Sequence, residues 1–191
     1  MSPDFSRAHL EATKLLLKQD ITDLNIDVRE FNYDKKIVID SVQHYSDVVH
    51  RDISCFTTKE FNGSCFIEYC DHGLYVVLYD ENEPYERKKH WGIAHEIGHI
   101  YLGHTQDGEK EEIEAHFFAA QLIVPEIVLL YYAKLNGGHI DSSDIYSSFN
   151  CSFRAANKRI KTLQSNVWSF NKYDRQLLTK FKPIIEKKLI S

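Results

Sequence analysis

His95-Glu96-Ile97-Gly98-His99 is the most informative stretch of this 191-residue chain. Two histidines four positions apart share one face of a helix, so both rings can bind the same zinc ion at about 2.0–2.1 Å. A glutamate between them can take a proton from a metal-activated water and pass it to a leaving amine. The stretch therefore predicts a metal-dependent hydrolase in which His95 and His99 bind the metal and Glu96 is the general base.

The residues around this HExxH motif predict a largely buried helix. Seven small or apolar residues lie at positions compatible with burial: Trp91, Ala94, Ile97, Gly98, Ile100, Tyr101 and Leu102. Polar side chains in a buried helix need partners, and a buried His-Glu-His group without a metal leaves costly unsatisfied groups. We therefore prefer a metal site to the alternative, a pair of hydrogen-bonded core histidines.

A third protein ligand is expected downstream, because catalytic zinc sites usually have three protein ligands and leave the fourth position to water. The candidates are Glu111, Glu112, Glu114 and His104. Zincins with three histidines in one run place the last histidine ten residues after the first. This chain has Thr105 there, so His104 does not fit that pattern.

The acidic cluster opens a second predicted helix, which carries a resemblance to a known family. Residues 112–125 read Glu-x-x-Ala-x-x-Phe-Ala-Ala-x-Leu-x-x-Pro. Together with the upstream motif, this run resembles the ImmA/IrrE family of zinc metallopeptidases, whose second motif is usually Glu-x-x-Ala-Asn-x-Phe-Ala-Ala-x-Leu-Leu-Met-Pro. The resemblance implies that His95, His99 and Glu112 bind one Zn²⁺ per chain. It also implies that Glu96 is the general base.

Helical spacing also favours Glu112 over Glu114, which is the second choice of ligand. His116 lies four residues after Glu112 and shares its face, so it could orient the ligand. The family usually has asparagine where this chain has His116. A histidine can donate a hydrogen bond as asparagine would, and it can also titrate or approach the metal and close the open coordination position.

The predicted reaction is hydrolysis of a peptide bond in a protein. A donor for the developing oxyanion is also required, and Tyr101, His104 and His72 are the candidates. The resemblance implies that the substrate is a helix-turn-helix repressor or antitoxin, and that its cleavage relieves repression of transcription under stress. Two alternatives stay open. One is a non-catalytic regulatory or toxin-antitoxin-type binding protein with a structural zinc site, and the other is a hydrolase of small-molecule amides.

The composition fits a modest soluble enzyme, with 43% hydrophobic and 13% aromatic residues. No run approaches the roughly eighteen apolar residues of a transmembrane helix. The first nineteen residues have the mixed charges of an amphipathic helix rather than a secretory signal. The four cysteines show no Cys-x-x-Cys spacing, in agreement with a reducing compartment. We expect a cytoplasmic protein without a membrane partner.

We expect an α+β fold with a zincin-like metallopeptidase core, in which a small antiparallel sheet packs on the HExxH helix. Strands are expected at 37–39, 65–69 and 74–79, and the turn Asp71-His72-Gly73 joins the last two. An edge strand beside a zincin helix commonly receives a peptide as a further strand. The strand at 74–79 is therefore a candidate substrate edge, and a plain structural hairpin is the alternative. Further expected segments are helices at 7–19 and 27–34 and a polar loop at 82–89.

Domain organisation is predicted as a metallopeptidase core at residues 1–136 and a C-terminal helical extension at 137–191, or as one continuous domain. Helices are expected at 126–136, 142–149, 152–164 and 172–189. The pair between 142 and 164 looks like a helix-turn-helix, but its apolar residues favour ordinary packing. Direct nucleic-acid binding is therefore not expected. The expected partner is a separate protein substrate, a helix-turn-helix transcriptional regulator.

Overall fold

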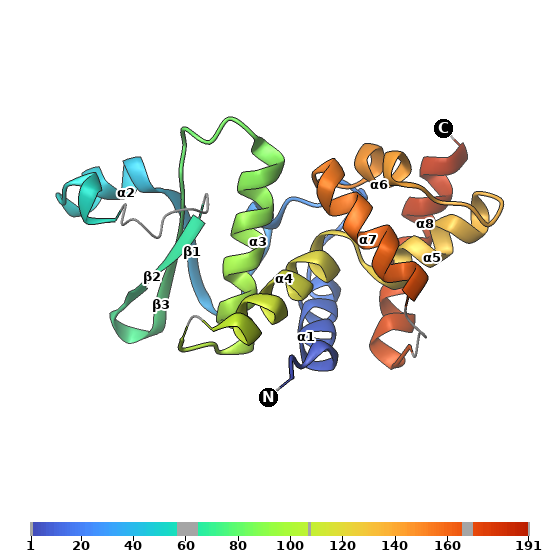
Figure 1. Cartoon of the computed structure of the whole chain (residues 1–191), viewed down its shortest axis with the longest axis horizontal. Helices are drawn as coiled ribbons and strands as arrows, with labels where there is room; N and C mark the ends of the chain where they lie inside the picture. Colours follow the sequence, from blue (N-terminus) through green and yellow to red (C-terminus); the bar gives the residue numbers. More distant parts are fainter. Residues whose placement is uncertain (1, 57–64, 107, 166–169, 191) are drawn as a thin grey trace.

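The structure is a computed structural model that describes residues 2–56, 65–106, 108–165 and 170–190. The first part of the chain forms α1 (Phe5–Leu17), β1 (Lys36–Ser41), α2 (Val42–Val49), β2 (Cys65–Cys70) and β3 (Leu74–Tyr79), with 3-10 turns at Val28–Glu30, Ile53–Cys55 and Asp71–Gly73. The second part forms α3 (Glu86–Leu102), α4 (Glu109–Ile123), α5 (Glu126–Leu135), α6 (Ser142–Ser148), α7 (Phe153–Ser165) and α8 (Lys172–Ile190). Figure 1 shows the sheet and α2 at one end of the molecule, α1, α3 and α4 in the middle, and α5 to α8 at the other end. The α+β class is as predicted.

The sheet has three strands in the order β1-β3-β2. β2 and β3 form the predicted antiparallel hairpin around the predicted turn, whereas β1 runs parallel to β3. The predicted antiparallel sheet is therefore wrong for β1. The prediction that 74–79 is an edge is also wrong, because β3 pairs on both sides. The edges among the described strands are β1 and β2.

Two local predictions differ from the structure, and one helix is an addition to them. Residues 27–34 form only the 3-10 turn Val28–Glu30, because tertiary contacts hold the segment: the Val28 N–H donates to Nε2 of His90 at 3.0 Å. The segment 82–89 is a loop only up to Tyr85, and α3 begins at Glu86. The helix α2 was not predicted. It begins directly after β1, where the Ser41 hydroxyl accepts a hydrogen bond from the His44 N–H and caps the helix.

The core gathers around α3, which contacts α4, α1, β2 and β3. Its fully buried apolar side chains interlock with those of the neighbouring helices, among them Leu15, Leu16, Ile93, Ile97, Phe118 and Leu122. Burying a side chain of this kind contributes about 1.5–3 kcal/mol, so this cluster fixes α3 in place. The helix that carries the HExxH motif is therefore the structural centre of the molecule.

The C-terminal helices share this core. Leu177, Phe181 and Ile185 of α8 are fully buried in the same cluster, and α8 packs on both α1 and α5. The hydrophobic core thus continues across residue 136, and the predicted division there stays a prediction. Among the described residues no single helix is long and apolar enough to cross a membrane, and only α4 and α5 together, a pair bent by 41°, have the length and composition.

Candidate metal centre

Gly98 lets α3 and α4 approach each other closely. A Cβ atom at this position would lie 3.2 Å from the carbonyl oxygen of Ala115 and 3.2 Å from Cδ1 of Phe118. These distances are tight, and the Ala115 atom belongs to the backbone, which cannot turn away. Glycine at this point therefore allows the first half of α4 to lie against the second half of α3.

Gly103 ends α3 and turns the chain back. It adopts the left-handed conformation with φ of 63°, which glycine adopts without steric cost, and its N–H bonds to the last turn of the helix. The next residue, His104, donates its backbone N–H to the carbonyl of His99 at 3.1 Å. This turn places the side chain of His104 against that of His99.

His95, His99 and Glu112 converge across the α3–α4 contact. The two Nε2 atoms of His95 and His99 are 3.0 Å apart, and the Glu112 carboxylate oxygens lie 3.3 Å and 3.2 Å from them. The hydrogen bond with His95, with the nearby histidine rings, lowers the pKa of Glu112 to about 2, although partial burial opposes this. The two rings are buried, but the Glu112 side chain is 45% exposed. The cluster is thus an ionised carboxylate and two histidines open to solvent on one side.

The geometry of this cluster fits a metal ion. One donor atom from each residue lies within 4.8 Å of the others. Four bonds of about 2.0–2.1 Å at tetrahedral angles place ligand atoms roughly 3.3 Å apart, which is close to the three separations found here. Two imidazole nitrogens and a carboxylate oxygen are the donors that such sites use. The three predicted ligands are therefore brought together in an arrangement compatible with a divalent metal.

A chain of hydrogen bonds supports His99 from behind. Nδ1 of His99 lies 3.0 Å from Nδ1 of His104, and Nε2 of His104 lies 3.0 Å from the buried carboxylate of Glu114. Glu114 also accepts the backbone N–H of Asp4 at 2.7 Å. A neutral His99 that keeps its Nε2 lone pair for a metal carries its proton on Nδ1 and donates it to His104, whose Nε2–H then donates to Glu114.

His95 is supported differently. Its Nδ1 atom is buried and has no hydrogen-bond partner among the described residues. Its ring packs instead against the ring of His116, with 4.2 Å between the centroids. Burial, together with the nearby His95 ring and Lys158 charge, lowers the pKa of His116 to about 4. His116 lies outside the group of convergent donor atoms, so in this structure it does not close the fourth position.

Three of the further candidate residues have contacts elsewhere, and a fourth lies in an exposed turn. Glu114, the second choice of ligand, is bonded to His104 and is not part of the convergent group. Both ring nitrogens of His104 lie at hydrogen-bonding distance from partners inside the protein, and its candidacy as oxyanion donor stays a prediction. The Tyr101 hydroxyl donates to Asp34 at 2.6 Å, and its candidacy for the same role also stays a prediction. His72 lies in the exposed hairpin turn and has no described contact with the cluster.

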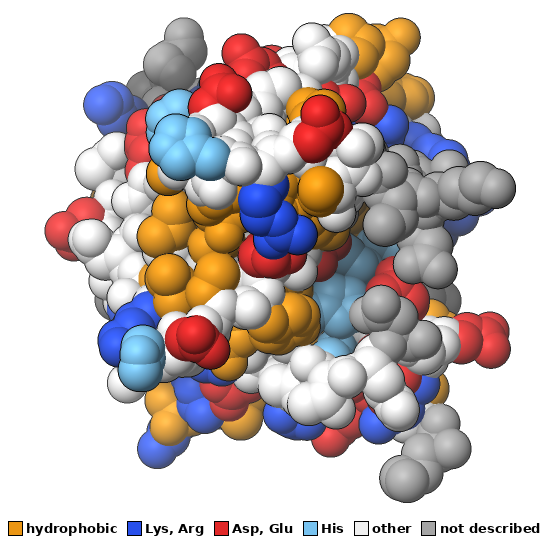
Figure 2. All heavy atoms as spheres, turned by 90° about the vertical axis from the view of Figure 1, so that its left-hand side faces the viewer, with side chains coloured by type: hydrophobic (Ala, Val, Ile, Leu, Met, Phe, Trp, Pro, Cys, Tyr) orange, Lys and Arg blue, Asp and Glu red, His pale blue; other side chains and the backbone are white. Residues whose placement is uncertain are grey.

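Sequence reasoning missed the pairing of His104 with Glu114. The signal that could have found it is Gly103, because a glycine directly after a helix folds the next side chain back on the last turn. Glu96 follows His95 on α3 and is half-buried. Its role as general base stays a prediction. Figure 2 views the molecule from the end that carries the sheet. On this face, histidine side chains lie in a recess between hydrophobic and acidic side chains.

An HExxH helix packed on a small sheet, with a third donor from the next helix, is the arrangement of a zincin-like core. The chain also matches the peptidase family described as the IrrE N-terminal-like domain, over residues 50–161. The match covers more than half of the chain, so the protein belongs to this family, and the resemblance seen in the two motifs is confirmed. The chain has no significant match among curated proteins or solved structures.

Proposed function

We propose that this protein is a zinc-dependent endopeptidase that hydrolyses a peptide bond in a protein substrate. One observation carries the proposal: three donor atoms converge at a point where the Glu112 side chain is 45% exposed. Structural zinc sites are usually closed by four protein ligands, whereas catalytic sites keep a position open. Among the described residues only His95, His99 and Glu112 converge, which favours a catalytic site.

Bound zinc would supply Lewis-acid activation of water and of the scissile carbonyl. The protein would supply the rest. His104 would hold His99 in the tautomer that leaves its Nε2 lone pair for the metal, and Glu112, with its pKa lowered to about 2, would stay ionised throughout the physiological range. Glu96, next to His95 on α3, would take the proton of the attacking water and deliver it to the leaving amine.

The substrate backbone would add to the sheet at β2. In the strand order β1-β3-β2 this strand lies at one side of the sheet, and both β2 and β3 pack on α3. The Cys65 thiol at the start of β2 donates to the carbonyl of Lys89 at 3.5 Å, so this strand begins beside the first half of α3. An extended peptide on this edge would gain backbone hydrogen bonds.

The family resemblance supports a helix-turn-helix repressor or antitoxin as the substrate, and its cleavage would relieve repression. The test uses a regulator of this kind encoded beside the gene, incubated with the zinc-loaded protein. We expect one discrete cleavage that a chelator stops. The Glu96→Gln variant should retain zinc and lose at least about 100-fold in rate, the usual size of a general-base contribution.

The matched control is Glu109→Gln, which neutralises an exposed carboxylate in the first turn of α4 and should cut at the wild-type rate. If wild-type protein leaves every candidate regulator intact with zinc and other divalent metals, the peptidase proposal is wrong. Cleavage that persists in Glu96→Gln would exclude Glu96 as the base. A partner that binds tightly without being cut would favour the alternative of a structural zinc site.

A further inference from the structure

A cavity of about 400 Å³ lies next to the metal centre, between α4, α7 and the starts of α1 and α3. Most of its surface is apolar. The residues that the argument uses are Trp91, Ile113, His116, Ala120, Lys158 and Arg159. A cavity of this size accommodates a large amino-acid side chain together with part of its backbone.

His116 belongs both to the lining of this cavity and to the surroundings of the predicted metal ligands. The His116 ring contacts the His95 ring at 4.2 Å between centroids, and His116 also lines the cavity. Trp91 precedes His95 by one helical turn and lies on the same side of α3. A peptide bond at the metal centre would therefore have a neighbouring side chain within reach of the cavity.

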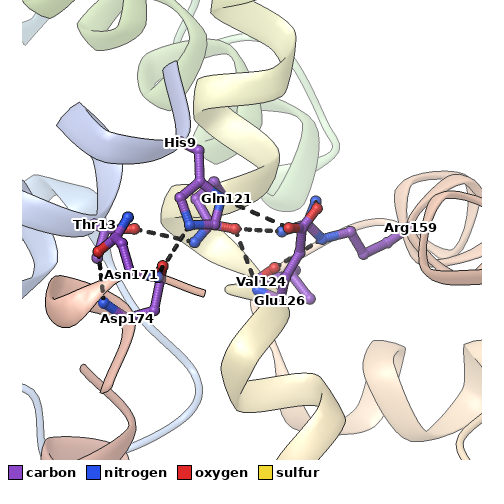
Figure 3. A network of polar contacts seen from close by, with 8 residues as sticks. All are labelled: His9, Thr13, Gln121, Val124, Glu126, Arg159, Asn171 and Asp174. Atoms are coloured by element: carbon purple, nitrogen blue, oxygen red, sulfur yellow. Dashed lines mark hydrogen bonds and ion pairs between the residues drawn. The ribbon is translucent and has the colours of Figure 1, made fainter. Parts of the chain in front are cut away.

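Arg159 does not give the cavity an available charge. Its guanidinium donates to the Val124 carbonyl at 2.8 Å, to Glu126 at 2.8 Å and to Gln121 at 2.7 Å. Figure 3 shows this buried network, in which every arm of Arg159 points at a protein acceptor. Each nitrogen of the Arg159 guanidinium is thus hydrogen-bonded within the protein. An apolar side chain buried against it would break none of these polar contacts.

Lys158 is the charge that remains for a ligand. It lines the cavity, its side chain is exposed, and it forms no ion pair with any described residue. A cationic rim around an apolar cavity is complementary to an apolar side chain that has a carboxylate beside it. A basic side chain at the same place would be repelled.

We propose that this cavity selects the substrate: it takes a large apolar side chain, such as Leu, Met or Phe, directly beside the scissile bond, while an Asp or Glu close to that residue contacts Lys158. This inference rests on the proposed peptidase function and adds the class of sequence that is cut. It also predicts binding that does not depend on turnover.

The test is a library of capped hexapeptides applied in two ways. In the first, the library is incubated with zinc-loaded wild-type protein, and the cut sites are read by mass spectrometry. We expect at least about tenfold enrichment of large apolar residues on one side of the cut and of acidic residues nearby. In the second, the library is captured on immobilised Glu96→Gln protein, and the bound peptides should have the same two features.

Variants connect these preferences to the cavity. Ala120→Leu fills it and should remove the apolar preference, and Ile113→Asp, at a position that is 38% exposed, should do the same if the first variant does not fold. Lys158→Glu should convert the acidic preference into a basic one. Lys161→Glu, an exposed lysine of α7 outside the cavity, is the matched control and should change neither preference.

The two proposals can fail separately. Cleavage without an apolar preference, or preferences unchanged in Ala120→Leu and Lys158→Glu, would overturn the cavity proposal and leave the peptidase proposal intact. Absence of any cleavage, of the library and of the candidate regulators alike, would overturn the peptidase proposal. In that case captured peptides without apolar and acidic enrichment would overturn the cavity proposal as well.

Discussion

His104 is the residue whose contacts say most about how the predicted metal ligands are held in place. It lies between His99 and Glu114, and both of its ring nitrogens are 3.0 Å from a partner. Although burial opposes ionisation, the hydrogen bonds from Asp4 and His104 hold the pKa of Glu114 below its ordinary value. The Glu114 carboxylate, at the far end of this series of hydrogen bonds, favours the tautomer of His99 that leaves Nε2 free.

Replacing His104 by alanine should therefore weaken metal binding. We expect a loss of about 10–100-fold in zinc affinity, the usual effect of removing a partner of a ligating histidine. A competition titration against a fluorescent zinc chelator measures the affinity directly. His104→Asn, which can bond to one neighbour only, should fall between wild type and His104→Ala.

The exposed residue His44 on α2 provides the control for this measurement, because its ring contacts only Asp40 among the described residues. His44→Ala should bind zinc as wild type does. Equal affinity in wild type and His104→Ala would mean that the hydrogen-bond chain does not support the metal site.

At the level of elements, the contact between α3 and α4 creates the site, since it brings Glu112 opposite two histidines from another helix. Neither helix carries a complete ligand set. The separation of the two helices therefore controls the distance between the donors, and Gly98 is the point of closest approach that a side chain would obstruct.

Gly98→Ala should both destabilise the protein and weaken zinc binding. In an unobstructed helix this change stabilises by about 1 kcal/mol. Here the new methyl group would lie 3.2 Å from the Ala115 carbonyl oxygen, and we expect a net loss of about 1–3 kcal/mol. Urea unfolding and the zinc titration are the measurements. A higher free energy of unfolding for Gly98→Ala than for wild type would contradict this prediction, because it would show that the helices do not touch at Gly98.

Over the whole molecule, a buried polar network joins the first and last helices to the middle of the chain (Figure 3). His9 of α1 lies 2.6 Å from Asp174 of α8 and 3.6 Å from Glu126 of α5, and Glu126 pairs with Arg159 of α7 at 2.8 Å. With His9 protonated, the two cations balance the two carboxylates. Although burial opposes the charge, these contacts raise the pKa of His9 to about 9.

The stability of the protein should consequently fall at alkaline pH. Because the pKa of His9 is higher in the folded than in the unfolded state, its contribution is complete below an unfolded pKa of about 6.5 and is lost as the pH rises through about 9. The shift sets an upper limit of about 3 kcal/mol. Urea unfolding between about pH 6 and pH 10 measures the loss.

The comparison variant His9→Gln should be less stable than wild type near neutral pH, and the difference should shrink toward pH 10. Subtracting the free energy of unfolding of His9→Gln from that of wild type at each pH removes the contribution of the lysines and tyrosines, which titrate in both proteins. A difference that stays constant over this range would exclude His9 as the titrating group.

The sequence by itself determined the local parts of this protein. His95 and His99 share a helix face because of their spacing, the hairpin around Asp71–Gly73 follows from its turn residues, and the second motif identified Glu112. Each of these features depends on residues within a few turns of one another. That is why the family could be predicted from the two motifs before any coordinates, and with it, from the resemblance, the residues His95, His99 and Glu112 that the structure brings together.

Only the tertiary structure decided how distant segments meet. The parallel pairing of β1 with β3, the support of His99 by His104 and Glu114, the cavity between α4 and α7 and the network around Arg159 all join residues from separate elements. No periodicity or spacing encodes such contacts. They form because the chain must bury its apolar faces and satisfy its buried polar groups together, and that condition applies to the whole fold rather than to any one stretch.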